Sequence, residues 1–216
     1  MSFFGGFGSG GNTTTTFDNE AGIFSTNTRI SQTGTNNQKA HFHYGGTELS
    51  FEIDSLNLVT ASLNLFGNNQ DQRSLQFANT SMDDVLTQSY NLNNTANLRF
   101  TGLDIGVNYQ LGFKSSKDRL LTLSYKYSYS PNKQFNGNVL SDRFSYPESR
   151  FPDYQQYNDA GDRDHTIQLD YASPISKALS IEAGAKAILR DNYSNFHVEN
   201  RDSVTQQYAT VDTLTN

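Results

Sequence analysis

The chain contains no cysteine and has few basic residues, and each of these deficits excludes a class of protein. Without cysteine it can hold neither a disulfide scaffold nor a thiolate-bound metal. Its 16 Lys and Arg are outnumbered by 22 Asp and Glu, and the formal charge of -6 would repel the phosphates of a nucleic acid. We therefore expect no nucleic acid among the partners of this protein.

Long apolar segments are missing as well. No part of the sequence supplies the roughly 20 apolar residues of a membrane-spanning helix, and residues 1–17 lack the features of a secretory signal. Hydrophobic residues make up 35% of the chain and the mean hydropathy is -0.65, which is low for 216 residues with a core of their own. Because 12% of the residues are aromatic, disorder is not expected either. The sequence indicates a folded chain that devotes few residues to an interior.

What the chain does have is apolar residues at every second position, which is the period of a β-strand. The alternation is clearest in residues 49–65, 101–129 and 167–189. It predicts about seven antiparallel strands. Three hairpins are expected, with turns at 54–57, 114–118 and 172–177. The predicted fold is all-β, an antiparallel up-and-down meander that forms part of a large transmembrane β-barrel.

The first 50 residues have a less regular pattern. Residues 1–21 are rich in glycine and threonine and are expected to be a flexible or irregular lead-in. A weak strand is expected from about residue 22 to residue 31. Tyr44 then alternates in the opposite phase to Leu49, and we expect Gly45 and Gly46 to form a bulge that corrects the phase.

The connections between the predicted strands alternate in length. Short turns close the hairpins, whereas residues 67–97 and 131–163 are expected to be long loops between hairpins. Loops of that length are uncommon in compact soluble domains but usual on the outer side of outer-membrane barrels. We expect the barrel wall to span residues 22–191, with residues 192–216 as a loop or the start of another strand. Proline cannot donate a ladder hydrogen bond, so the four prolines are expected in connections: Pro131, Pro147, Pro152 and Pro174.

The hairpin of residues 101–130 predicts its own register. If Leu111 faces Leu121, every apolar residue of one strand meets an apolar residue of the other, ending with Leu103 opposite Tyr129. The strand from Leu103 to Phe113 rises about 3.3 Å per residue, and a tilt of roughly 40° gives a band about 25 Å tall, the height of the hydrocarbon zone. The apolar face is therefore expected to contact lipid, with tyrosines as an aromatic girdle near its loop side. The predicted lipid-facing residues are Leu103, Ile105, Val107, Tyr109, Leu111, Phe113, Leu121, Leu123, Tyr125, Tyr127, Leu179 and Ile181.

The opposite face of the same strands is polar and is expected to line a lumen. Its charged residues are expected to pair with one another more often than to touch a substrate. The predicted lumen-facing residues are Asp104, Asn108, Lys126, Asp170, Glu182, Lys186 and Arg190. The second long loop is dense in aromatic residues that could contact a ligand, although packing within the loop is the commoner role. These loop residues are Phe144, Tyr146, Phe151, Tyr154 and Tyr157.

No catalytic or metal-binding set is found in the sequence. There is no G-x-S-x-G elbow, and none of the four histidines has a readable nucleophile partner. His41 and His43 share a strand face but lack a third ligand nearby. We expect neither an enzyme nor a protein with a metal or another cofactor.

Residues 165–196, HTIQLDYASPISKALSIEAGAKAILRDNYSNF, resemble the outer-membrane β-barrel family of TonB-dependent receptors, and the likeness extends loosely over residues 38–200. The resemblance implies a barrel of about 22 strands, closed by a plug domain, that imports scarce nutrients across the outer membrane. Its implied partners are membrane lipid, the remaining strands, the plug domain and an inner-membrane energy-transducing complex. This chain would be a piece of the wall. The matching residues are Asp170, Tyr171, Pro174, Glu182, Gly184, Lys186 and Arg190.

The alternative is a soluble β-sandwich or small barrel that serves as a binding module, with carbohydrate as a candidate ligand. The two hypotheses differ in what covers the apolar face. If Val107, Tyr125 and Ile181 were sealed in a two-layer core, the transporter hypothesis would fail. The sequence does not identify a transported substrate.

Overall fold

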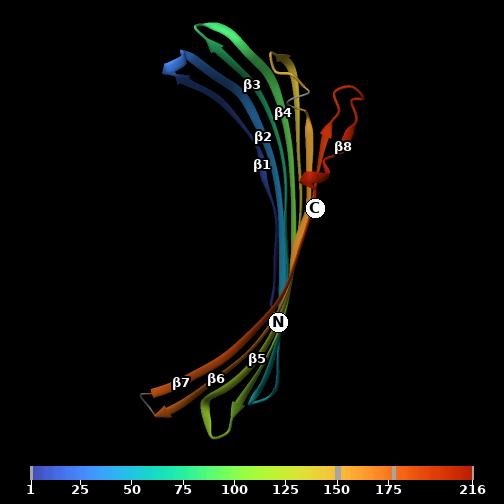
Figure 1. Cartoon of the computed structure of the whole chain (residues 1–216). Helices are drawn as coiled ribbons and strands as arrows, with labels where there is room; N and C mark the ends of the chain where they lie inside the picture. Colours follow the sequence, from blue (N-terminus) through green and yellow to red (C-terminus); the bar gives the residue numbers. More distant parts are fainter. Residues whose placement is uncertain (1, 149–151, 177–178, 216) are drawn as a thin grey trace.

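The computed structural model describes residues 2–148, 152–176 and 179–215, which form one curved antiparallel sheet (Figure 1). Each of its eight strands pairs with the next strand along the chain, so the predicted all-β antiparallel meander is confirmed. The strands are β1 (Ser2–Ile23), β2 (Thr28–Asp54), β3 (Asn57–Met82), β4 (Val85–Phe113), β5 (Ser116–Phe144), β6 (Tyr154–Ser176), β7 (Leu179–Arg201) and β8 (Tyr208–Thr210). Two short 3-10 helices, η1 (Phe24–Thr26) and η2 (Asp212–Leu214), complete the described elements.

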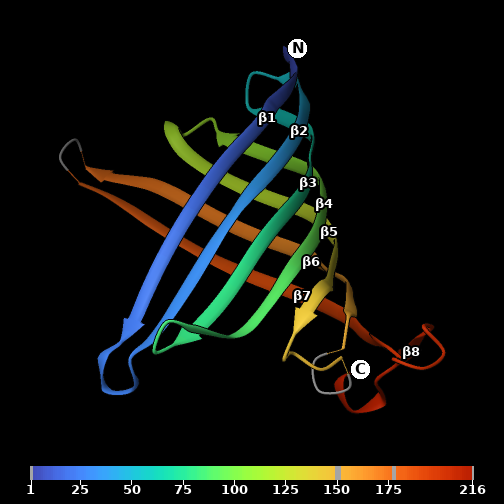
Figure 2. The ribbon, with the colours of Figure 1, turned by 90° about the horizontal axis from the view of Figure 1, so that it is seen from above.

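The sheet is a single layer. Seen edge-on it is a crescent, and seen from above its two edges, β1 and β7–β8, do not meet (Figures 1 and 2). Among the described residues, Ala78 and Val198 are the buried hydrophobic ones. Val107, Tyr125 and Ile181 are 42%, 40% and 50% exposed, so no second layer seals the apolar face. The alternative of a two-layer sandwich is therefore wrong.

The strands are much longer than the alternation predicts. β4 and β5 have 29 residues each, and β2 and β3 have 27 and 26. The prediction of long loops at 67–97 and 131–163 is wrong: β3 and β4 are joined by two residues, and β5 and β6 by residues 145–153. Beyond the apolar part, both faces carry mostly Asn, Gln, Ser and Thr. The apolar alternation therefore stops there, while the backbone pairing continues.

The glycine- and threonine-rich start of the chain is also a strand. Residues 2–23 pair with β2 from Ser2 opposite Glu48 to Ile23 opposite Thr28, so the expected lead-in over residues 1–21 is wrong. The weak strand expected from residue 22 is instead interrupted by η1, which joins β1 to β2. At the other end, residues 192–201 continue β7 and are not a loop.

The expected bulge at Gly45 and Gly46 is absent, because β2 pairs without interruption there with β1 and β3. The register shift lies in β1, between Ser9 and Gly11, and Gly11 has a φ of 74°. Since β2 stays in phase, Tyr44 lies on the opposite face from Leu49. The change of phase in the sequence therefore marks the point where the apolar side chains of β2 move from one face of the sheet to the other.

Two of the four prolines lie inside strands, contrary to expectation. Pro147 and Pro152 are in the β5–β6 connection, whereas Pro131 is in β5 and Pro174 is near the end of β6. The β4–β5 pairing has a gap beside Pro131, which has no N–H to donate. On its other side Pro131 pairs with Gly161 of β6, where an added Cβ would lie 3.0 Å from the Pro131 Cα.

Short turns join the strands at both ends of the sheet. Asp83 and Asp84 both have positive φ, 50° and 61°, the backbone of a two-residue type I′ hairpin. Asn27 Nδ2 donates to Asp83 Oδ1 over 2.8 Å, which ties the β1–β2 connection to this hairpin. At the other end, Asp54 accepts from the Leu56 amide over 2.8 Å, and this bond lowers the pKa of the Asp54 carboxyl. The turn expected at 172–177 is wrong for residues 172–176, which belong to β6, and residue 177 lies outside the described residues.

Within the described ranges, no helix has the length and apolar character needed to cross a bilayer.

Candidate functional site

The apolar face of the sheet is the outer, convex one. The β4–β5 register is the predicted one: Leu111 faces Leu121, Val107 faces Tyr125 and Leu103 faces Tyr129. The same rows continue into neighbouring strands, so that Val107 also pairs with Ala61 of β3. All twelve predicted lipid-facing residues lie on this face by register, and six of them rank among the exposed large hydrophobic residues: Ile105, Val107, Leu123, Tyr125, Leu179 and Ile181.

Aromatic side chains border this apolar band along both of its edges. On the edge toward residues 83–84, the Arg163 guanidinium lies 5.4 Å from the centre of the Tyr129 ring, and the Tyr127 ring centroid lies 5.1 Å from that of His165. On the opposite edge, the Phe113 and Tyr171 rings meet edge to face at 6.3 Å. The Arg119 guanidinium lies 5.9 Å from the centre of the Phe113 ring. Tyrosines with one apolar and one polar end are suited to such a border.

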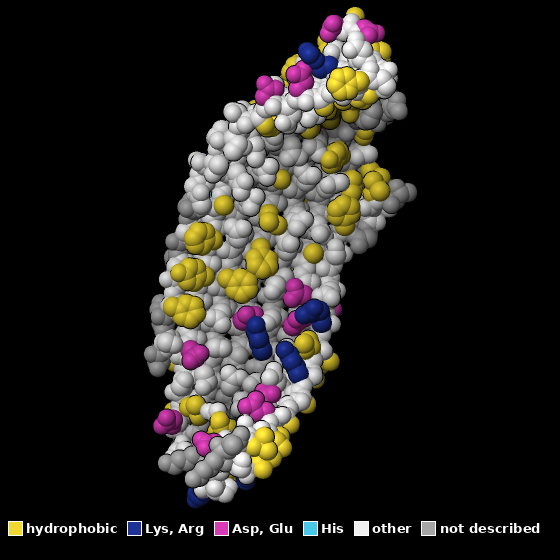
Figure 3. Space-filling model, turned by 90° about the vertical axis from the view of Figure 1, so that its left-hand side faces the viewer, with side chains coloured by type: hydrophobic (Ala, Val, Ile, Leu, Met, Phe, Trp, Pro, Cys, Tyr) yellow, Lys and Arg dark blue, Asp and Glu magenta, His cyan; other side chains and the backbone are white. Residues whose placement is uncertain are grey.

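The concave face holds a charged hollow, which we define by the residues that line it. Figure 3 looks onto the concave face and shows Lys and Arg gathered with Asp and Glu in its lower half. The hollow has a volume of about 540 Å³ and spans β3 to β7. It brings together five of the seven predicted lumen-facing residues: Asp104, Asn108, Lys126, Lys186 and Arg190.

The charges of this hollow are mostly paired. Lys126 Nζ lies 3.0 Å from Asp104 Oδ2. Arg190 donates to Asp164 twice, from Nε over 2.7 Å and from Nη2 over 2.5 Å. The Arg190 side chain is 57% exposed, so solvent screens this ion pair. Lys186 forms no ion pair with any residue that the structure describes.

The remaining two predicted residues lie on the same face but outside the hollow. Asp170 accepts from Gln168 Nε2 over 2.7 Å and pairs with Gly184, where an added Cβ would come within 2.4 Å of Asp170 Oδ1. Gly184 therefore makes room for Asp170, and both are among the residues that carry the family resemblance. Glu182 lies opposite Ala172, and no ion pair is found for it in the described part of the chain.

The aromatic residues of the expected second loop are not brought together. Tyr146 packs on Tyr90 with ring centroids 4.6 Å apart, and partial burial, together with the Tyr146 phenol, raises the pKa of Tyr90. Tyr157 lies within β6 on the outer face, 5.1 Å from Phe135. These ring contacts agree with packing, the commoner of the two roles considered for these aromatic residues. Tyr154 begins β6, Phe144 ends β5 with 49% exposure, and Phe151 lies outside the described residues.

Asp153 is a site that the sequence reading missed. Its side chain is 1% exposed and accepts from Arg143 Nη2 over 2.6 Å and from Arg201 Nη1 over 3.1 Å. It also accepts from the Leu140 amide over 2.8 Å. One buried carboxylate thus fastens the β5–β6 connection to both β5 and the end of β7. Its arginine partners are 10 and 48 residues away in sequence, so no local pattern reveals it.

A second missed feature is a group of aromatic rings on the concave face, which we call the aromatic patch. The register places its members in adjacent rows of β1 to β4. In Figure 3, hydrophobic side chains gather above the charged hollow on this face. Phe66 and Phe100 are neighbours, with ring centroids 5.7 Å apart. The patch consists of Phe4, Phe42, Tyr44, Phe66 and Phe100.

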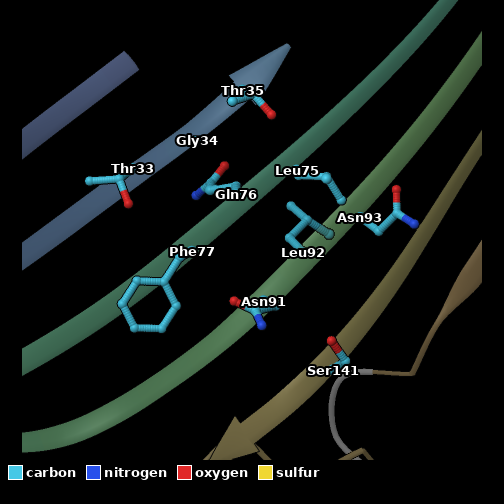
Figure 4. A pocket seen from close by; sticks show the side chains of 10 residues that line it. All are labelled: Thr33, Gly34, Thr35, Leu75, Gln76, Phe77, Asn91, Leu92, Asn93 and Ser141. Atoms are coloured by element: carbon cyan, nitrogen blue, oxygen red, sulfur yellow. The ribbon is translucent and has the colours of Figure 1, made fainter. Parts of the chain in front are cut away.

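A further hollow lies on the outer face, beyond the apolar band. It has a volume of about 480 Å³ and is lined by ten uncharged residues of β2 to β5, which are shown in Figure 4. Its apolar side chains are those of Leu92 of β4 and of Leu75 and Phe77 of β3, which are 55% and 44% exposed. The other lining residues are Thr, Asn, Gln, Ser and Gly, so the hollow offers no group for acid–base or metal chemistry.

Comparison with known proteins finds a family model that matches part of the chain. The model of the outer membrane protein beta-barrel family matches residues 111–216. These residues carry the sequence pattern of an outer-membrane β-barrel. No curated protein matches the chain. A solved structure of P. aeruginosa FpvA, in complex with a heterologous pyoverdine and iron, is similar over 95% of this chain at 11% identity, with a TM-score of 0.29. The chain spans 37% of the length of that FpvA chain.

Proposed function

We propose that the chain forms part of the wall of a transmembrane β-barrel in the outer membrane. One observation carries the proposal: a single-layer sheet leaves a continuous apolar band exposed on its convex face. Soluble monomers rarely expose apolar patches of more than a few hundred Å². Lipid satisfies such a band, and the aromatic residues along its edges fit the two interfaces of a bilayer. The family model that matches residues 111–216 supports the same location.

The length of the strands gives the barrel wall two levels. The band from Leu103 to Phe113 is about 25 Å tall at a tilt of roughly 40°. On the same basis, β3 continues from Leu65 to Met82 for roughly 40 Å beyond the band. The charged hollow lies at the level of the band and the polar extension stands above it. In this arrangement the concave face lines the lumen.

We infer further that the barrel takes up a nutrient, in the manner of TonB-dependent receptors. The motif resemblance over residues 165–196 and the family model support this role. The chain would act with the remaining strands, a plug domain and an inner-membrane energy-transducing complex. Such uptake depends on capture and movement of the substrate, so it needs no catalytic group from this wall.

The absence of cysteine allows a direct test by single-cysteine labelling. Val107→Cys and Asn108→Cys are adjacent on β4 but face opposite sides of the sheet. Each variant is labelled with the fluorophore NBD and inserted into vesicles that contain doxyl-labelled lipids. We expect strong quenching at position 107 and weak quenching at position 108. Thr95→Cys, on the same face as Val107 but beyond the band, is the matched control and should be quenched weakly. Equal quenching at positions 107 and 108 would refute the proposed location.

A further inference from the structure

We propose that the aromatic patch and the polar side chains above it bind a neutral saccharide on the concave face. This inference rests on the proposed function, because the concave face must be the lumen of the barrel. It adds the substrate class, which neither the family model nor the charged hollow indicates.

With the exception of Phe100, the rings of the aromatic patch lie over a glycine of a neighbouring strand. An added Cβ at Gly8 would lie 1.9 Å from Phe42 Cζ, and one at Gly6 would lie 2.7 Å from Tyr44 Cε1. Each of these two rings therefore rests on a glycine of the neighbouring strand, and only glycine leaves room for it. One ring face packs on backbone and the other is turned toward the lumen.

The same arrangement occurs between β3 and β4, where an added Cβ at Gly102 would lie 2.2 Å from Phe66. Phe4, Phe42 and Tyr44 remain 52%, 46% and 48% exposed. Apolar rings grouped in an aqueous lumen leave unfavourable surface uncovered. A ligand that stacks on them would cover that surface.

Amide side chains occupy the concave face next to this patch. On β2 to β5, every described concave-face residue from the row of Phe42 up to the row of Asn36 is uncharged. Four of these amides line a hollow of about 230 Å³: Gln70, Gln72, Gln134 and Asn136. Each amide can both donate and accept a hydrogen bond, as a hydroxyl group can. We call these four residues the amide field.

This combination selects the chemistry of the occupant. A sugar ring presents apolar C–H groups on one face and hydroxyls around its rim, so it can stack on a ring of the patch while bonding to amides. An anionic ligand would leave water without meeting a counter-charge, which is costly. Of the three cations that line the charged hollow, Lys126 and Arg190 are already paired, and Lys186 lies in the hollow below the aromatic patch and outside the amide field. A neutral saccharide fits this surface better than a charged ligand does.

Because the chain contains no tryptophan, a tryptophan introduced by substitution is its single indole fluorophore. In the F42W variant, held in a detergent without a sugar headgroup, the single indole lies in the aromatic patch. The neutral probes are maltohexaose, cellohexaose and chitohexaose, and the competing probes are an oligogalacturonate and a hexa-alanine peptide. We expect a saturable change in indole emission with at least one neutral probe. Tighter binding of the anionic probe or of the peptide would overturn the inference.

Two further measurements fix the place of binding. Y44L should weaken the affinity about three- to tenfold, because stacking on an aromatic ring contributes about 0.5–1.5 kcal/mol. The matched control Y157L lies on the outer face and should leave the affinity unchanged. Spin labels at Gln72→Cys and Arg73→Cys face opposite sides of β3, and only the label at position 72 should broaden the oligosaccharide proton resonances.

Titration calorimetry of the wild-type protein keeps the test decisive even if a variant fails to fold. Failure of all three neutral oligosaccharides to bind, or equal broadening from both spin labels, would overturn the saccharide inference. The lipid-quenching experiment is independent of any sugar. Normal quenching without sugar binding would therefore refute this inference alone, and absent quenching would refute the barrel.

Discussion

A charge placed on the convex face should test the proposed lipid contact through its effect on the free energy of unfolding. The band runs from Leu103 to Phe113, so Val107 lies within about 3 Å of its middle at a tilt of roughly 40°. Val107 is 42% exposed and has Ala61 and Tyr125 beside it in the row. An arginine on the lipid face at the midplane costs about 2–4 kcal/mol. Val107→Arg should therefore lower the ratio of folded to unfolded protein roughly 30- to 700-fold.

The measurement is urea-induced unfolding from lipid vesicles, followed by tyrosine fluorescence. Two matched variants separate the lipid effect from the effect of an added charge. Asn108→Arg puts the same charge on the concave face, and Thr95→Arg puts it on the convex face beyond the band. Both should shift the free energy of unfolding by about 0.5 kcal/mol or less, as surface substitutions do.

The three variants together decide between lipid and water on the convex face. If Val107→Arg costs no more than Thr95→Arg, the apolar band meets water or another protein, and the wall proposal fails. If Asn108→Arg is as costly as Val107→Arg, the two faces are not chemically distinct. Only a large cost at position 107 alone agrees with the proposed barrel wall.

Three further outcomes are expected. Asp153→Ala should destabilise the β5–β6 connection by about 3 kcal/mol, because it removes the buried carboxylate that accepts from the partly exposed Arg143 and Arg201, and hydrogen exchange at the Leu140 amide should speed up accordingly. Gly102→Ala should cost about 1–3 kcal/mol by displacing the Phe66 ring, whereas Gly45→Ala, whose Cβ would meet nothing closer than 3.9 Å, should be nearly neutral in thermal unfolding. Backbone and side-chain hydrogen bonds from Thr205 lower the pKa of Asp202, so the turn they form should be stable above the ordinary carboxyl pKa and be lost as pH falls through the lowered pKa, as an NMR titration would show.

The sequence was sufficient for the apolar band and its register. Alternation places Val107 opposite Tyr125 because any one-residue slip would set each apolar side chain against a polar one. The same alternation gave the face of Lys126 and Arg190, since successive side chains on a strand point to opposite sides. Their ion pairs follow from the register, which puts Arg190 beside Asp164.

The polar extension could not be predicted in this way, because the apolar pattern reports the surroundings of a strand more than the strand itself. Gln72 and Arg73 of β3 are both polar, yet their backbones pair on both sides as regularly as those near Val107. In the proposed wall, the part of a strand above the bilayer meets water on both faces and needs no apolar residue on either. Without that signal, the extension is indistinguishable from a loop in sequence.

Glycines opposite aromatic residues mark the aromatic patch, but in the sequence alone they suggested a bulge. Gly45 and Gly46 suggested a bulge, but Gly46 lies under the ring of Phe4, where an added Cβ would come within 2.4 Å. A glycine opposite an aromatic residue on the next strand is therefore a pairing signal, which only the register reveals. Gly6 and Gly8 follow the same rule with Tyr44 and Phe42.

Three chemically different surfaces follow one another along the concave face. A ligand that enters from the side of residues 83–84 meets the amide field first, then the aromatic patch and last the charged hollow. The pairs Lys126–Asp104 and Arg190–Asp164 bring opposite charges together, so their fields largely cancel a short distance away. A neutral ligand is therefore neither trapped nor repelled by the hollow, whereas an anion would be drawn to Lys186, which has no ion-pair partner among the described residues. Selection for a neutral ligand would then rest on the uncharged surface above the hollow, with the charges below serving to hold the wall together.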